Sequence, residues 1–262
     1  MPRFIDISVA IEDAPINPPH HRPKIAYANH DETWEGFKKY YPGADPDQIV
    51  DRKAWASETV TLITHSGTHM DAPWHYHPTM NHRTTHGGEP AATIDQVPLE
   101  WCFRPGVKLD FRGLAHGYVA TAKDVDGELS RIGYTLKPLD IVLINTSAAA
   151  HYGQDDYWES GCGMGREATL HLLEKGVRVV GTDSFGWDAP FAHTAKRFAA
   201  SGDHALLWEG HKAGREIGYY QMEKLHNLEA LPPFGFTIAC FPVKIKGASA
   251  GWTRAVAILE DK

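Results

Sequence analysis

One short stretch of this sequence gathers side chains that bind metal ions and transfer protons. Within eleven residues it holds three histidines and a carboxylate, namely His65, His69, Asp71 and His75. On extended backbone, residues two apart point the same way, and Gly67 permits a tight turn that brings His65 back toward the pair. Two imidazoles and a carboxylate suit Zn²⁺, Mn²⁺ or Fe²⁺ better than Ca²⁺ or Mg²⁺. We therefore predict that His65, His69 and Asp71 bind a divalent metal ion.

His75 lies four residues after Asp71, the last of the predicted ligands, and this position favours proton transfer over metal binding. Three protein ligands leave a position open for water, whose pKa a bound cation lowers toward about 7. Hydrolysis still needs a group that takes up a proton and returns it to the leaving group, and imidazole changes charge near neutral pH. We assign this general acid and base role to His75. The alternative, surface or packed histidines, fits an isolated pair better than four groups together.

The composition indicates one globular enzyme domain and excludes several classes of partner. The chain has 262 residues, sixteen of them histidine, and a formal charge of −7. It has no dense basic stripe for nucleic acid and no apolar run of the roughly 18 residues that a membrane span needs. Because the first residues also lack a signal-peptide pattern, we expect a cytoplasmic protein. The widely spaced Cys102, Cys162 and Cys240 predict reduced, packed thiols.

Hydrophobic patterning predicts strands and one clear helix along the chain. Strands are expected at residues 3–11, 58–64, 106–111, 140–146, 177–180, 236–245 and 253–259, and a helix at residues 166–175. The strand at 58–64 runs directly into the histidine cluster. Residues 17–57 carry too many prolines for regular core elements and stay unassigned. The β-α-β rhythm around the helix predicts a single mixed α/β domain over residues 1–262.

The cluster also resembles the signature of a known family. HSGTHMDAPWH is similar to the His-x-Gly-Thr-His-x-Asp-x-Pro-x-His motif of the cyclase-like metal hydrolases, and the segments around Asp6, Asp183 and Thr253 resemble further strands of that family. The resemblance implies a swivelling β/β/α fold with a central barrel-like sheet, a homodimer or homotetramer, and Mn or Zn as the metal. It also implies hydrolysis of an amide, lactam or lactone in a small substrate that is cyclic or aromatic.

The same resemblance suggests additional metal ligands near the other end of the chain. In members of the family that bind two metal ions, a His and a Glu twelve positions apart complete a second site. His211 and Glu223 have this separation, so the resemblance implies one or two ions per chain. His204 is the rival ligand, and the alternative for His211 and Glu223 is an exposed position near a helix end.

Aromatic residues beside the cluster suggest how a substrate is bound. Trp74 adjoins His75, and Trp187 follows Asp183, so we predict that both contact a planar or apolar substrate; the alternative is that they pack in the core. Arg254 fits either a substrate carboxylate or the surface. Two other functions also stay open: a metal-assisted lyase or dehydratase on the same site, and a metal-binding protein without turnover.

Overall fold

The structure of the protein is a computed structural model that describes residues 1–14 and 21–260. The chain divides into two compact units. The larger joins Met1–Ala10 with Thr64–Lys262, and the smaller is Ile11–Ile63. All predicted site residues belong to the larger unit. A single domain over residues 1–262 stays a prediction.

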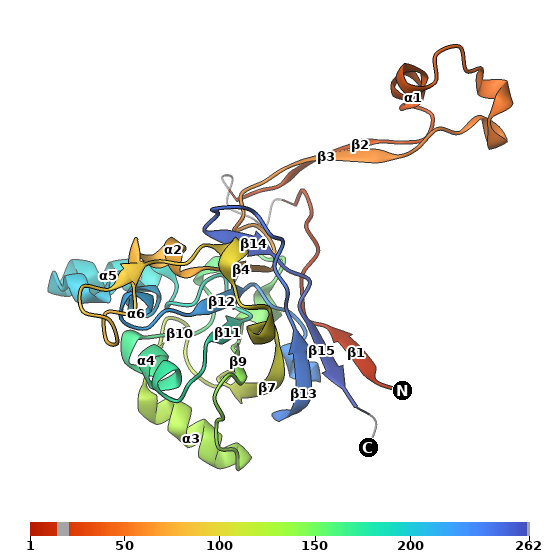
Figure 1. Cartoon of the computed structure of the whole chain (residues 1–262). Helices are drawn as coiled ribbons and strands as arrows, with labels where there is room; N and C mark the ends of the chain where they lie inside the picture. The colour runs from red at the N-terminus through yellow and green to blue at the C-terminus, as the bar shows by residue number, and fades with distance from the viewer. Residues whose placement is uncertain (15–20, 261–262) are drawn as a thin grey trace. The chain divides into compact units, whose positions relative to one another are not determined.

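In the described part of the chain, the larger unit is built on a curled nine-stranded sheet (Figure 1). The strand order is β1 (Arg3–Asp6), β15 (Val256–Leu259), β13 (Phe234–Ala239), β7 (Phe103–Asp110), β9 (Ile141–Asn145), β11 (Val179–Thr182), β12 (Tyr220–Glu223), β4 (His69–Asp71) and β14 (Ala250–Trp252). The central strands β7, β9, β11 and β12 run parallel, and the strands outside them pair antiparallel. The predicted mixed α/β fold with a barrel-like sheet is confirmed.

The parallel strands are connected by α3 (Ala122–Ile132), α4 (Arg166–Glu174), α5 (Phe191–Ser201) and α6 (Glu209–Glu216), and a short helix, α2 (Pro73–Tyr76), follows β4. A capping box between Thr121 and Asp124 begins α3, and α4 matches the helix predicted at residues 166–175. Short two-stranded ladders, β5 (Thr79–Met80) with β6 (Glu89–Pro90) and β8 (Val119–Ala120) with β10 (Gly163–Met164), complete the unit. None of the helices in the described ranges has the length and apolar character of a membrane span.

The core packs on both faces of the sheet. Every residue of β9 is buried. Val142 and Ile144 pack with side chains from α3 and α4, and Ile141 and Leu143 pack in a separate cluster with Met70. Because successive strand residues point to opposite faces, a strand covered on both sides is apolar throughout. Each large apolar side chain buried in this way contributes about 1.5–3 kcal/mol.

Apart from one strand, which overlaps the strand expected at 58–64, the smaller unit contains regular elements that the sequence did not predict. A hairpin of β2 (Lys24–Ala28) and β3 (Ser57–Thr61) carries α1 (Trp34–Tyr40), which has no buried residue. Phe37 contacts the rings of Trp34 and Trp55 with centroids 5.2 and 5.3 Å apart. Residues 21–57 therefore form regular elements with aromatic contacts among them, and none of these residues belongs to the two clusters of the core. Positions 17–20 lie outside the described residues.

Several strands are shorter than the sequence predicted. The strand expected at 58–64 ends at Thr61, and the histidine cluster has its own strand, β4. The strand expected at 3–11 ends at Asp6, whose carboxylate accepts a hydrogen bond from the Ser8 N–H and closes a turn. The strand expected at 236–245 ends at Ala239, before Pro242, which has no N–H for a ladder.

Candidate metal centre

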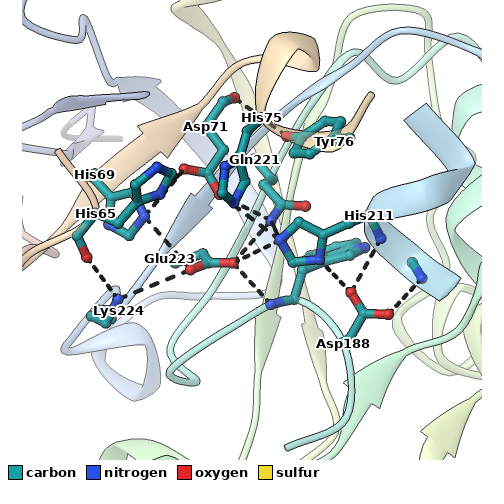
Figure 2. A network of polar contacts seen from close by, with 12 residues as sticks. His65, His69, Asp71, His75, Tyr76, Asp188, His211, Gln221, Glu223 and Lys224 are labelled. Carbon is teal, nitrogen blue, oxygen red and sulfur yellow. Dashed lines mark hydrogen bonds and ion pairs between the residues drawn. The ribbon is translucent and has the colours of Figure 1, made fainter. Parts of the chain in front are cut away.

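The pairing register of β4 and β12 brings together the polar side chains of the candidate metal centre. In the antiparallel pair β4 and β12, His69 lies opposite Glu223 and Asp71 lies opposite Gln221. Between these residues, Met70 and Met222 are fully buried on the other face of the sheet. Alternation along both strands therefore presents His69, Asp71, Gln221 and Glu223 on one face, and Figure 2 shows these side chains converging.

A turn before β4 fixes the orientation of the second histidine. Gly67 has a φ of 62°, the left-handed conformation that glycine adopts without strain. The Nδ1–H of His69 donates to the Gly67 carbonyl at 2.9 Å. The lone pair of Nε2 consequently points into the centre, the arrangement expected of a metal-binding imidazole.

Two buried atoms of the centre lack hydrogen bonds. His69 Nε2 and Asp71 Oδ1 are both inaccessible to water, and among the described residues neither has a hydrogen-bond partner. They lie 3.2 Å apart, and Asp71 Oδ1 is 2.9 Å from His65 Nδ1. Nitrogen and oxygen donors that share an ion at about 2.1 Å from each lie about 3.0–3.4 Å apart. The predicted ligands His65, His69 and Asp71 therefore fit a divalent metal ion.

Two further residues bring potential ligand atoms to the same carboxylate. His65, Asp71 and His75 form one group of mutually close donor atoms, and His69, Asp71 and Glu223 form a second. Glu223 Oε2 lies 3.6 Å from His69 Nε2. Asp71 is thus the shared member of both groups.

The charges at the centre favour ionised carboxylates. Burial alone raises the pKa of Asp71, but the imidazoles of His69 and His65 hold it well below its usual range. Burial and the Asp71 charge raise the pKa of Glu223, whereas the contact with His211 and the Lys224 charge lower it, with a net fall to about 2. Two buried carboxylates therefore present their negative charges where a cation would bind.

His75 reaches the centre from α2, one turn beyond β4. Its Nε2 is 3.9 Å from Asp71 Oδ2, and its ring packs against that of His65 with centroids 4.1 Å apart. Burial lowers the pKa of His75 to about 4, so the ring is neutral at pH 7. A neutral imidazole at this position has a lone pair available for a proton or for an ion.

His211 lies beside the carboxylates of Asp71 and Glu223, and His204 does not. The Nε2 of His211 is 3.4 Å from Glu223 Oε1 and 3.9 Å from Asp71 Oδ2. Its Nδ1 contacts the Asp188 carboxylate, which also accepts from the backbone N–H groups of Gly210 and His211 at the start of α6. His204 is exposed and packs against Phe198.

The sequence reasoning missed four residues of the centre. They are Asp188, Trp208, Gln221 and Lys224. Trp208 has a φ of 61° and stacks on His211 at 4.4 Å between centroids, and Lys224 Nζ donates to the His65 carbonyl at 3.0 Å. One signal was present for Gln221: QME at 221–223 repeats the polar-Met-polar pattern of HMD at 69–71. Asp188, Trp208 and Lys224 left no comparable signal. The positive φ of Trp208 and contacts between residues far apart in the sequence produce no recognisable sequence pattern.

Trp74 and Trp187 have side chains outside the polar cluster, and their contact with a substrate stays a prediction. The Trp187 indole is fully buried in the core, where Nε1 donates to Thr169 Oγ1, and only its backbone N–H reaches Glu223 Oε1, at 3.1 Å. Trp74 is exposed and lines a surface depression with Met80. Both indoles thus lie away from the polar cluster, because α2 turns Trp74 outward and α4 covers Trp187. Arg254 forms an exposed ion pair with Asp6.

A pocket beside the centre has a mostly apolar lining with several aromatic side chains. Its wall includes Trp158, Phe185, Phe191 and Trp208, with His211 and Asp188 at the polar end. Trp208 also meets the ring of His75 edge to face, with centroids 5.0 Å apart. This pocket can accommodate an apolar group next to the polar cluster.

Comparisons with known proteins agree with the fold and the motif. A sequence model of the family described as "Putative cyclase" matches residues 5–189. Kynurenine formamidase from Salinibacter ruber is 27% identical over 199 residues, which cover 76% of this chain and 77% of the relative. An isatin hydrolase bound to the product analogue thioisatinate superposes with a TM-score of 0.73 at 18% identity, over 99% of this chain and 93% of that one. Isatin hydrolase A from Labrenzia aggregata superposes with a TM-score of 0.72 at 20% identity, over 99% of this chain and 94% of that one.

Because the matched residues span most of the chain, this protein belongs to the cyclase family. The solved structures support the same curled α/β fold.

The cysteines agree with the expected reduced state, since Cys102, Cys162 and Cys240 are all buried and free.

Proposed function

We propose that this protein is a metal-dependent hydrolase that cleaves an amide, lactam or lactone bond of a small substrate. The observation that carries the proposal is the pair of buried atoms, His69 Nε2 and Asp71 Oδ1, that have no hydrogen-bond partner among the described residues. Burying such atoms without partners costs free energy, which an ion shared with His65 and Glu223 would offset. The family membership and the similarity to a formamidase support the same chemistry.

Each residue of the centre has a defined task in this proposal. His65, His69 and Asp71 hold Mn or Zn, with Glu223 Oε2 as a further donor. The ion, when bound, supplies Lewis-acid activation of water and of the scissile carbonyl. His75 accepts a proton and returns it to the leaving nitrogen or oxygen, since its ring is neutral and adjoins Asp71. His211, oriented by a hydrogen bond between its Nδ1 and the Asp188 carboxylate, turns Nε2 toward Asp71 and Glu223.

The substrate carries an aromatic or other planar apolar group in this proposal. The pocket lined by Trp158, Phe185, Phe191 and Trp208 adjoins His211 and gives such a group a surface to pack against. An N-formylated aromatic amine and an aromatic lactam both combine a planar ring with a carbonyl that water can attack. The expected homodimer or homotetramer and the cytoplasmic location stay predictions.

The test uses metal-stripped enzyme reconstituted separately with Mn²⁺ and Zn²⁺. We expect hydrolysis of N-formylkynurenine, isatin or a simple lactone only after reconstitution, followed by loss of activity on chelation. A product mass without added water would indicate a lyase or dehydratase. Metal binding without turnover of any substrate in the panel would support the non-catalytic alternative.

A further inference from the structure

A second ion on the side of Asp71 that faces His211 would bind three ligand atoms. They are Asp71 Oδ2, Glu223 Oε1 and His211 Nε2, the donors left on the side away from Asp71 Oδ1. His211 Nε2 lies 3.9 Å from Asp71 Oδ2 and 3.4 Å from Glu223 Oε1. Judged by these distances alone, the three atoms could surround an ion.

The side-chain amide of Gln221 lies among the same three atoms. Its Nε2 is 3.3 Å from Asp71 Oδ2, 2.9 Å from Glu223 Oε1 and 2.7 Å from His211 Nε2. Figure 2 shows the dashed contacts converging on this nitrogen. An amide nitrogen carries two N–H donors and no available lone pair, so it competes with an ion for these acceptors and cannot itself bind one.

The neighbouring groups fix the orientation of this amide. With Nε2 toward the two carboxylates and the ring of His211, its two N–H groups are shared among three acceptors, and Oε1 accepts a hydrogen bond from the Tyr219 hydroxyl at 2.9 Å. The reverse orientation would place the amide oxygen against two negatively charged oxygens. Gln221 is fully buried, so no solvent would relieve that repulsion.

The same contacts fix the orientation of His211. Its Nδ1 lies against the Asp188 carboxylate, and its Nε2 lies 2.7 Å from the Gln221 nitrogen. Because an amide nitrogen offers only N–H groups, Nε2 of the ring is directed at this amide and not at an ion.

Glu223 Oε1 is also occupied by a second donor. The backbone N–H of Trp187 donates to it at 3.1 Å, in addition to the Gln221 amide. Two hydrogen bonds use both lone pairs of this oxygen. By contrast, Oε2 of the same carboxylate faces His69, on the side where Asp71 Oδ1 has no hydrogen-bond partner among the described residues.

We propose that the Gln221 amide takes the place of a second cation, so that the centre holds one metal ion per chain, on the His65, His69 and Asp71 side. This inference rests on the proposed metal-dependent function. Gln221 is in this view a positioning residue: it holds Asp71, Glu223 and His211 together by hydrogen bonds where an ion would otherwise join them.

The experiment measures metal content by mass spectrometry and the EPR spectrum of the protein reconstituted with Mn²⁺. We expect one ion per chain and the hyperfine pattern of an isolated Mn²⁺. Two ions per chain, or the spectrum of an exchange-coupled pair, would overturn the inference and leave the proposed function intact. No bound ion after reconstitution would overturn both.

Variants of Gln221 test whether the amide is the cause. Gln221→Glu replaces the donors with a carboxylate, and Gln221→Leu removes them without adding charge; we expect either folded variant to bind a second ion. Gln154→Glu, at an exposed position, is the matched control for the added charge and should stay at one ion. A Gln221 variant that folds and still binds one ion would contradict the assigned role. The wild-type stoichiometry decides the count even if both variants fail to fold.

Discussion

At the scale of single residues, the centre depends on a few atoms whose hydrogen-bonding capacity is directed inward. His69 uses Nδ1 to bond the Gly67 carbonyl, which leaves Nε2 for the centre. The Asp188 carboxylate orients His211 in a comparable way through Nδ1. Backbone and carboxylate partners of this kind set the tautomer of an imidazole and typically change metal affinity or activity about 10–100-fold when removed.

Replacing His69 with alanine should empty the proposed metal site. The substitution removes the buried Nε2 and leaves Asp71 Oδ1 with one fewer neighbouring donor. Metal content after chelation, repurification and reconstitution is the measurement, and we expect most of the bound ion to be lost. His204→Ala, at an exposed histidine outside the centre, is the control and should keep its metal. Full metal content in His69→Ala would show that the ligands lie elsewhere.

Replacing His75 with alanine should separate metal binding from turnover. If His75 transfers protons, kcat falls roughly a hundredfold or more while metal content stays near that of the wild type. If His75 is instead a ligand beside His65 and Asp71, the variant loses metal. A lower melting temperature with little change in kcat would identify a packing role. Metal content, melting temperature and kcat measured on one variant therefore distinguish the three roles.

Residue types and short spacing predicted one part of the centre and not the other. His65, His69 and Asp71 are local, and alternation with a glycine turn suffices to bring them together. His211 and Glu223 came only from family resemblance, because their approach depends on strand pairing across more than half of the chain. The outward direction of Trp74 and the burial of Trp187 depend on the packing of α2 and α4, which the sequence around these residues does not specify.

At the scale of elements, the close approach of β10 to the segment that carries Asp188 supports the centre. A Cβ built on Gly163 would lie 1.9 Å from the Ala189 nitrogen and 2.1 Å from the Asp188 carbonyl carbon. Met164, the next residue, bonds the Trp187 carbonyl through its N–H at 2.8 Å. The loop that orients His211 can therefore occupy its position only because residue 163 has no side chain.

The corresponding prediction compares two glycines. Gly163→Ala should lower the free energy of unfolding by about 2–4 kcal/mol, because backbone atoms must move to admit the methyl group. Gly127→Ala lies on the exposed side of α3 with no atom near the added Cβ, and should raise stability by about 0.5–1 kcal/mol. Denaturant melts of both variants provide the measurement. Equal stability of the two would contradict the close-approach explanation.

Element types were easier to predict than element ends. The parallel strands β7, β9 and β11 and the helix α4 appear where apolar runs and the glycine after α4 indicated. The strand predicted at 58–64 was wrong at its end, since alternation in ETVTLIT continues past Thr61 although the ladder with β2 stops there. Alternation of apolar and polar residues shows that a segment is suited to a strand. The extent of hydrogen bonding to a neighbouring strand determines where the strand ends.

At the scale of the whole molecule, metal binding should contribute to stability. An ion that binds only the folded chain stabilises it by about 2.7 kcal/mol when its concentration is 100 times Kd. For proteins of this size each kcal/mol shifts Tm by about 2–4 °C. We expect chelation to lower Tm by roughly 5–10 °C, a loss that readdition of Mn²⁺ or Zn²⁺ reverses. An unchanged Tm in scanning calorimetry would indicate that the buried donors of the centre do not hold an ion.

The central claim is that the cluster around Asp71 performs hydrolysis, and isotope labelling tests it most directly. The metal-reconstituted protein is incubated with isatin and with N-formylkynurenine in water enriched in ¹⁸O, and the products are analysed by mass spectrometry. Hydrolysis predicts one ¹⁸O atom from solvent in the new carboxylate, isatinate or formate, and no such product from the chelated protein. Turnover that forms a product without solvent oxygen, or equal incorporation with and without metal, would contradict the account.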